Sequence, residues 1–204
     1  MKTIIITGPS CSGKTILSNK LLKLFNDSIV IKTDSYYRDN ILIKFLSIFQ
    51  YDIYDRLLSI KKNQINKIIS SIYNKERFVL FYHYDFMRKK SYQTKLPIKY
   101  SDINQYLILE GIFAHRLDLN YQETINIVCE EEKEICYKRR IKRDQLERGR
   151  NIREVNNKFS RSWFLFYKNF QRNQKRNKFI VLNPVDKRSF DKLALNLKNI
   201  KLNN

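Results

Sequence analysis

Several features are scarce in this 204-residue sequence, and each scarcity narrows the class of protein. The three cysteines, Cys11, Cys129 and Cys136, have neither the spacing of a zinc site nor that of a disulfide framework, which favours free thiols in a reducing compartment. No apolar run approaches the roughly 20 residues of a membrane span, and we see no signal-peptide pattern, internal repeat or low-complexity segment. We therefore expect a soluble, cytoplasmic protein without a membrane partner, folded as a single domain over residues 1–204.

Acidic residues are half as numerous as basic ones. The chain has 20 Asp and Glu against 40 Lys and Arg, which gives a formal net charge of +20. Such a surface attracts polyanions in general, so nucleic acid, acidic membrane and phosphorylated small molecules all remain open as partners. The basic residues are spread along the chain rather than gathered in one tail. Charge alone therefore does not choose among these partners.

Glycine is also scarce, yet two of the four glycines fall in one motif. The phosphate-binding pattern G-x-x-x-x-G-K-[ST] is matched by Gly8, Pro9, Ser10, Cys11, Ser12, Gly13, Lys14 and Thr15. The motif follows an apolar run typical of a buried parallel strand (2–7) and precedes a helical pattern. In such a loop, backbone N–H groups and Lys14 hold phosphate oxygens, and the Thr15 hydroxyl ligates Mg²⁺. The motif predicts a nucleotide site, with an ordinary turn before a helix as the alternative.

Further apolar segments predict strands over 28–33, 77–82, 106–111, 125–129 and 178–182. Asp34 follows the first of them, at the edge where ligands bind in open α/β sheets, and could accept a proton from an attacking hydroxyl. A helix N-cap is the alternative role for Asp34. Glu110 lies at the tip of another strand, in a position that suits a carboxylate facing Mg²⁺.

Helical periodicity covers 51–73, 130–149, 155–175 and 188–202. Residues 40–50 are apolar without a clear assignment, and the stretch after Lys90 through Pro97 is interpreted as a polar link. Arg140 and Arg143 are three residues apart on one helix, so they share a face that could hold a phosphate, with a solvated basic face as the alternative. The aromatic residues of 155–175 could stack on nucleic acid, but their helical spacing favours a place in the core.

Four segments resemble motifs of one family, in the same order as in that family. These are D-S-Y-Y at 34–37, Y-D-F at 84–86, L-E-G-I at 109–112 and R-R-I-K-R-D-Q-L-E-R-G-R at 139–150. Together with the phosphate loop they resemble the uridine kinase (uridine–cytidine kinase) branch of the phosphoribulokinase/uridine kinase P-loop family, over about 2–195. The resemblance implies an α/β, three-layer P-loop NTPase fold, with a mostly parallel sheet flanked by helices and an arginine-bearing lid over about 137–158.

The resemblance also implies roles for individual residues. Asp34 would be the base that takes the proton of a ribose 5′-hydroxyl. ATP or GTP would be held by the phosphate loop with Lys14, Arg143 and Arg148, and Mg²⁺ by Thr15 and Glu110. The nucleoside would contact Asp34, Tyr37, Asp52, Tyr84, Phe86, Lys89, Arg140, Arg150 and Lys158. A homo-oligomer, tetramer or dimer, is implied as well.

Two positions depart from the family pattern. Lys89 stands where the family usually has a histidine that touches the base, and Lys158 stands where a glutamine is usual. The stretch 51–58 also lacks the family's H-P-D-A-F-D beyond Asp52 and Asp55. We therefore keep two alternatives: a related kinase acting on nicotinamide riboside, ribulose phosphate or pantothenate, and a basic nucleic-acid-binding protein that retains the fold without catalysis.

Overall fold

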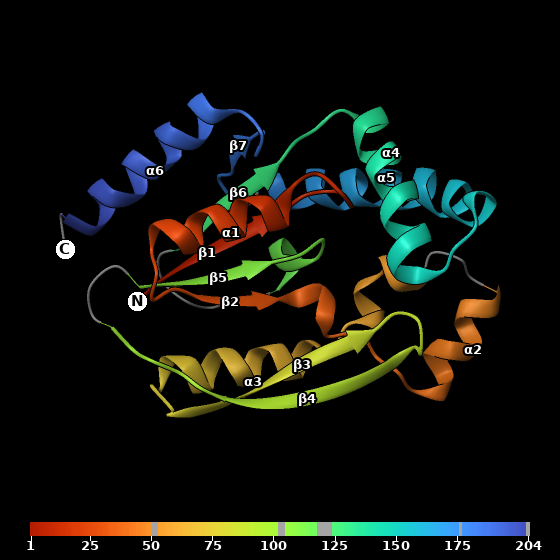
Figure 1. Cartoon of the computed structure of the whole chain (residues 1–204), viewed down its shortest axis with the longest axis horizontal. Coiled ribbons are helices and arrows are strands. Elements are labelled where there is room, and N and C mark those ends of the chain that lie inside the picture. The colour runs from red at the N-terminus through yellow and green to blue at the C-terminus, as the bar shows by residue number, and fades with distance from the viewer. Residues whose placement is uncertain (50–52, 102–104, 118–123, 176, 203–204) are drawn as a thin grey trace.

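The computed structural model describes residues 1–49, 53–101, 105–117, 124–175 and 177–202. Its main sheet has five parallel strands in the order β2-β5-β1-β6-β7 (Figure 1). The strands are β1 (Lys2–Thr7), β2 (Ile29–Lys32), β5 (Tyr106–Glu110), β6 (Thr124–Cys129) and β7 (Ile180–Leu182). Helices cover both faces of this sheet. The three-layer α/β fold expected from the sequence is confirmed.

The sheet brings the strand ends together at one edge. β1 lies in the centre, with Ile4 and Ile6 fully buried, and pairs in parallel with β5 on one side and β6 on the other. Ile6 is in register with Glu110, and the phosphate loop begins one residue after β1 ends. Because all five strands run the same way, the residues that follow β1, β2 and β5 meet at this carboxyl edge.

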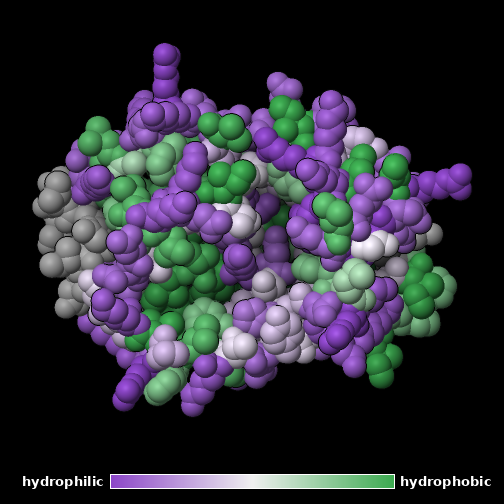
Figure 2. Space-filling view, in the orientation of Figure 1, coloured by the Kyte–Doolittle hydropathy of each residue, from purple (hydrophilic) through white to green (hydrophobic). Residues whose placement is uncertain are grey.

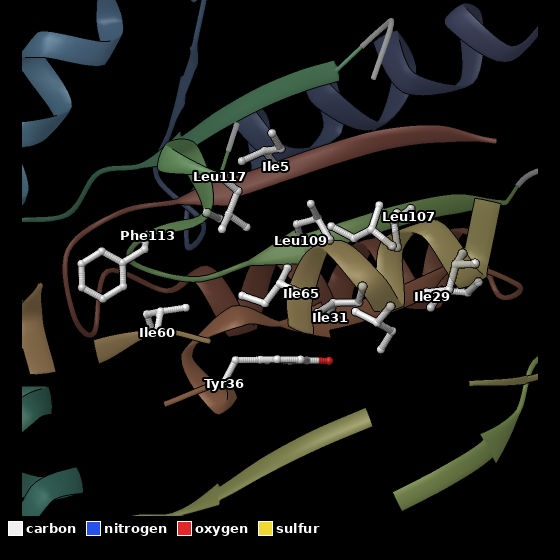
Figure 3. Packing of buried hydrophobic residues seen from close by; sticks show 14 of the residues in the cluster. Ile5, Ile29, Ile31, Tyr36, Ile60, Ile65, Leu107, Leu109, Phe113 and Leu117 are labelled. Carbon is white, nitrogen blue, oxygen red and sulfur yellow. The ribbon is translucent and has the colours of Figure 1, made fainter. Parts of the chain in front are cut away.

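The helices bury their apolar faces on the two sides of the sheet. α1 (Lys14–Leu24) and α6 (Lys187–Leu202) pack on one side through a cluster that includes Leu17, Leu21, Leu193 and Leu197. α3 (Lys62–Tyr73) packs on the other side through Ile65, Ile68, Ile69 and Ile72. Figure 3 shows Ile65 beside Leu109 of β5, above the ring of Tyr36. No helix among the described residues is long and apolar enough to cross a membrane.

The predicted helix over 51–73 is wrong at its beginning. Its described part opens with two 3₁₀ turns, η2 (Ile53–Asp55) and η3 (Leu57–Ser59), and α3 starts only at Lys62. The backbone of 59–61 is held by the chain that follows β2, because Ser59 O accepts from Arg38 N at 2.7 Å and Lys61 N donates to Tyr36 O at 2.7 Å. These bonds use the groups that a continuous helix would need.

The stretch after Lys90 is a strand rather than a polar link. β3 (Phe78–Asp85) and β4 (Lys90–Pro97) form an antiparallel hairpin, with pairs from Phe78–Pro97 to Asp85–Lys90, and this hairpin is a separate two-stranded sheet. The unassigned stretch 40–50 contains α2 (Ile41–Phe49), and Oδ1 of Asn40, just before this helix, accepts the N–H of Ile43 at 3.1 Å. Figure 1 shows α2 and the hairpin on the side of β2 opposite α1.

The residues of the predicted lid, about 137–158, lie on two consecutive helices. α4 (Lys133–Arg148) ends at Gly149, which has a φ of 60° in the left-handed region where glycine is favoured. α5 (Ile152–Gln174) begins with a capping box in which Asn151 and Glu154 satisfy each other's backbone N–H groups. Half of the six aromatic residues of α5 are buried core residues, namely Phe159, Phe166 and Phe170, whereas Phe164 is exposed.

Candidate active site

A cavity of about 340 Å³ lies at the carboxyl edge of the main sheet. Its walls come from the phosphate loop, the ends of β2 and β5, the hairpin β3–β4, and the helices α4 and α5. Figure 2 shows the molecule hollowed near the middle of this face, with hydrophilic side chains around the hollow. The segments that the sequence marked as chemically active therefore meet around one pocket.

The phosphate loop is curled around the side chain of Lys14. Its Nζ donates to Gly8 O at 3.1 Å and to Pro9 O at 2.9 Å, and only 6% of the residue is exposed. Gly13 has a φ of 92°, and a Cβ there would lie 3.0 Å from Cγ of Pro184. The turn from loop to α1 thus needs glycine for both conformation and space. This geometry holds a cation at the helix N-terminus, where phosphate oxygens are favoured.

Thr15 and Glu110 form a pair of oxygen ligands beside the loop. The Thr15 hydroxyl donates to Glu110 Oε1 at 2.6 Å, and the Ser18 hydroxyl donates to Oε2 at 3.0 Å. Among the described residues there is no group of three or more His, Cys, Asp and Glu that could hold a metal ion. Mg²⁺ in nucleotide sites commonly takes one or two protein oxygens and completes its shell with phosphates and water. The Thr15–Glu110 pair fits that pattern.

Asp34 lies in the 3₁₀ turn η1 (Thr33–Ser35) that follows β2. Its Oδ1 accepts the N–H of Ile112 at 3.0 Å, a bond that joins the end of β2 to the chain after β5. Burial raises the pKa of this carboxyl above its ordinary value, Lys14 opposes the rise and Glu110 adds to it. A carboxylate of raised pKa is a stronger proton acceptor than an exposed one. The bond to Ile112 argues against the N-cap role, because it joins the Asp34 carboxyl to the chain after β5 and not to the backbone just after Asp34.

The arginines of α4 reach toward the phosphate loop. Arg143 Nη2 donates to Ser10 Oγ at 3.2 Å, and Arg139 Nη1 donates to Cys11 O at 3.4 Å. Arg148 lies over the ring of Phe86 in the hairpin, with 3.9 Å between the guanidinium carbon and the ring centroid. The lid therefore contacts both the loop and the hairpin in this structure.

Asp144 is a central residue of the site that the sequence reasoning did not select. It is fully buried, and four arginines of the lid surround its carboxylate: Arg140, Arg143, Arg148 and Arg150. The sequence held one signal for it, since Asp144 directly follows the basic run 138–143, and Glu147 is the one other acid before Arg150. Acids in such runs are usually exposed partners of neighbouring lysines, so spacing alone did not distinguish this one.

Aromatic rings form the wall of the pocket away from the phosphate loop. Tyr37 contacts Tyr84 and Phe86 with ring centroids 5.4 and 5.7 Å apart, and Tyr84 lies 5.1 Å from Phe86. Tyr54 joins them, 5.6 Å from Tyr37. Sequence reasoning missed Tyr54 because it placed this residue in a helix. The wall offers a stacking surface for a planar ligand.

The structure brings together most of the predicted site residues that it describes. Those lining the cavity are Ser10, Cys11, Gly13, Lys14, Thr15, Asp34, Tyr37, Tyr84, Phe86, Lys89, Glu110, Arg140, Arg143, Arg148, Arg150 and Lys158. Gly8, Pro9 and Ser12 are in the loop but are buried, and do not line the cavity. Asp52 lies outside the described residues. The roles proposed for individual residues stay predictions.

The family model of the phosphoribulokinase/uridine kinase family matches residues 3–189. The chain belongs to this family. A curated relative in the phosphoribulokinase/uridine kinase family is the uridine kinase of Ureaplasma urealyticum serovar 10, which is 27% identical over 228 aligned residues that cover 98% of this chain and 95% of the relative. This membership supports a P-loop kinase that uses a nucleotide.

Two solved structures share the fold at low identity. A protein described as a possible uridine kinase from Bacillus stearothermophilus has a TM-score of 0.55 and 14% identity, covering 89% of this chain and 88% of its own. The deoxyadenosine kinase of M. mycoides, solved with bound dATP, has a TM-score of 0.53 and 15% identity, covering 98% and 100%. At these identities the likeness shows the fold and nothing finer.

Proposed function

We propose that this protein transfers the γ-phosphate of ATP, or of GTP, to the 5′-hydroxyl of uridine or cytidine, giving UMP or CMP. It would act as a cytoplasmic enzyme of pyrimidine salvage. The observation that carries the proposal is that Lys14, Asp34, Glu110 and the lid arginines line one cavity whose remaining wall is aromatic. A phosphate-binding end and a ring-binding end in one pocket suit a donor nucleotide and a nucleoside facing each other.

On the donor side, the loop and lid supply the positive charge that phosphoryl transfer needs. Lys14 and the loop N–H groups would hold the β and γ phosphates, and Arg143 and Arg148 would close on them from α4. Arg143 already reaches Ser10 of the loop at 3.2 Å, so little motion is needed to meet a phosphate. Thr15 and Glu110 would hold Mg²⁺, which when bound neutralises charge on the transferring phosphate.

On the acceptor side, Asp34 would accept the proton of the 5′-hydroxyl as its oxygen attacks the γ-phosphorus. The bond from Ile112 N fixes one carboxylate oxygen at 3.0 Å, which leaves the other for the hydroxyl. The ribose would lie near Arg140 and the base against Tyr84 and Phe86, with Asp52, Tyr37 and Arg150 as further contacts. Holding both reactants in line is the main contribution that a kinase makes to the rate.

Lys89 and Lys158 favour a second candidate within the same chemistry. Both line the cavity, and Lys89 is exposed at the turn of the hairpin. Two ammonium groups on the acceptor side would suit a more anionic acceptor, such as a ribulose phosphate or pantothenate, better than a neutral pyrimidine. Nicotinamide riboside is a third acceptor for the same site.

We also propose that the enzyme is a homo-oligomer, a dimer or a tetramer. α2 carries five exposed apolar side chains: Ile41, Leu42, Phe45, Ile48 and Phe49, which are 56–86% exposed. Apolar residues gathered on one exposed helix are common at subunit interfaces. Light scattering on the purified protein would give the subunit number, and a monomeric mass at micromolar concentration would refute the proposal.

The test is phosphoryl transfer with Mg²⁺-ATP or Mg²⁺-GTP across a panel of uridine, cytidine, nicotinamide riboside, ribulose phosphate and pantothenate. We expect uridine or cytidine to be converted fastest, and Asp34→Asn to lower this rate by about 10²–10⁴-fold while leaving ATP affinity within a few fold. Asp27→Asn is a matched control, because Asp27 pairs with Lys99 away from the cavity. No turnover of any acceptor, combined with tight and strongly salt-dependent RNA binding, would instead support the nucleic-acid-binding alternative.

A further inference from the structure

The two carboxylate oxygens of Asp144 serve different arginines. Oδ1 accepts from Nε and Nη2 of Arg143 at 2.9 and 2.7 Å, and Nε of Arg148 is 3.5 Å away. Oδ2 accepts from Nη1 of Arg150 at 2.8 Å, and Nε of Arg140 is 3.6 Å away. One buried carboxylate thus divides four guanidiniums into two pairs.

The arginines held by Asp144 reach different parts of the pocket. On the Oδ1 side, Arg143 reaches Ser10 of the phosphate loop at 3.2 Å. On the Oδ2 side, Arg140 is bound to Ser162 of α5 at 2.5 Å, and the backbone N–H of Arg150 donates to the carbonyl of Asp144 at 3.0 Å. Arg143 therefore lies toward the donor and the Oδ2 pair lies toward α5, while Arg148, which shares Oδ1 with Arg143, lies over Phe86 of the acceptor wall.

The charges around Asp144 do not balance. Burial alone would raise the pKa of this carboxyl, but the surrounding guanidiniums, Arg143 first among them, hold it below its ordinary value, so the group is anionic. Asp144 is the one fully buried acid among these four guanidiniums, and exposed Glu147 adds a smaller interaction with Arg143. The four arginines therefore compete for one carboxylate, and an incoming phosphate that binds some of them would change how strongly the others interact with it.

We propose that Asp144 is a positioning residue that couples the donor and acceptor halves of the site, an inference that rests on the proposed kinase function. When donor phosphates bind Arg143 and Arg148, these two arginines interact less strongly with Oδ1 of Asp144. The carboxylate then holds Arg150 and Arg140 more firmly. The acceptor side is then ordered before the acceptor arrives. By linkage, bound acceptor strengthens donor binding by the same factor.

The first experiment measures this coupling by calorimetry. The probe is adenylyl-imidodiphosphate with Mg²⁺, titrated with and without saturating uridine. In the wild type we expect uridine to tighten analogue binding by about fivefold or more. In Asp144→Asn, which keeps the shape but removes the charge, we expect a ratio within about twofold of one. Glu134→Gln is the matched control, since Glu134 is an exposed acid in the first turn of the same helix, away from the four arginines, and it should keep the wild-type ratio.

The second experiment needs no acceptor, so it tests the role of Asp144 separately from the proposed substrate. Amide hydrogen exchange is followed with the analogue alone. In the wild type, protection should increase in the phosphate loop and also in 149–162, beyond the donor contacts, whereas in Asp144→Asn the increase should stay in the loop. If uridine and the other acceptors fail to bind while this difference is present, the proposed substrate is wrong and the role of Asp144 stands.

A further variant guards against a folding defect. Arg143→Gln breaks the Oδ1 side but leaves Asp144 charged and paired with three arginines, so the lid should stay folded. At saturating analogue it should also lack the added protection in 149–162. Wild-type coupling and wild-type protection in both Asp144→Asn and Arg143→Gln, or an uncoupled wild type that shows no protection beyond the loop, would overturn the inference.

Discussion

Gly111 is the residue at which a single methyl group should disturb the proposed base. It follows β5, and a Cβ built on it would lie 1.9 Å from Oγ1 of Thr33 and 2.7 Å from Oδ1 of Asp34. Both distances are far below van der Waals contact, so Gly111→Ala must push these side chains away. Thr33 is fully buried and its hydroxyl donates to Glu110 O at 3.1 Å, while Asp34 Oδ1 accepts from Ile112 N at 3.0 Å.

The cost follows from those two bonds. Losing a neutral buried hydrogen bond costs about 1 kcal/mol and losing one to a carboxylate about 1.5–3 kcal/mol, so Gly111→Ala should lower the free energy of unfolding by about 2.5–4 kcal/mol. Displacing a catalytic base by about 1 Å should lower kcat by about 100-fold. Urea denaturation measures the first quantity and phosphoryl transfer at saturating substrate measures the second.

A second substitution separates the two contacts. Thr33→Ala alone should cost about 1 kcal/mol of stability and leave kcat within a few fold, because Asp34 keeps its place. In the double variant, removal of Oγ1 should restore part of the stability lost by Gly111→Ala, so the two changes should not add. The rate should not recover, since Asp34 Oδ1 is still 2.7 Å from the new methyl. A Gly111→Ala protein with the wild-type rate and denaturation midpoint would refute this reasoning.

Three further predictions concern the base, the metal and the lid. The acid limb of the kcat/KM profile should lie above pH 3.8, because the pKa of Asp34 is raised above that value. As the pH falls through this pKa, Asp34 becomes protonated and can no longer accept the proton of the acceptor hydroxyl. Activity that persists to pH 3.8 would contradict the prediction. Thr15→Val should raise the Mg²⁺ concentration for half-maximal rate by about tenfold or more, and an unchanged Mg²⁺ titration would speak against Thr15 as a ligand. Asn151→Ala should lower stability by about 0.5–2 kcal/mol through loss of the capping box, whereas exposed Asn157→Ala should not; equal melting temperatures for the two would argue against the cap.

The parallel sheet and the donor half of the site were predictable because their signals are local. Ile4, Ile5 and Ile6 form a continuous apolar run that only a buried strand explains well, and the loop motif follows it directly. Asp34 and Glu110 each follow or end such a run. Since parallel strands end at one edge, their meeting there needs no knowledge of long-range contacts.

The acceptor half was harder because its signals are not local. β4 has mostly exposed or half-buried side chains, so it lacks the alternation of apolar residues that marks a strand, and it exists because β3 pairs with it. Ile53, Leu57 and Leu58 mimic a helical stripe, and their turns are instead set by the backbone of 36–38. The burial of Asp144 depends on arginines up to six residues away, whose side-chain directions the sequence does not give.

In the part of the chain that the structure describes, the hairpin β3–β4 shares no strand pairing with the sheet that carries the phosphate loop. The groups proposed for phosphate transfer are thus on one structural unit, and the rings proposed to select the acceptor, Tyr84 and Phe86, are on another. Substitutions near the turn at Lys89 can accumulate without disturbing the registers that pair Ile6 with Glu110 and Thr7 with Val128. Because of this division, the hairpin is the natural place for acceptor preference to diverge. Exchanging the hairpin between related kinases is a practical way to transfer that preference.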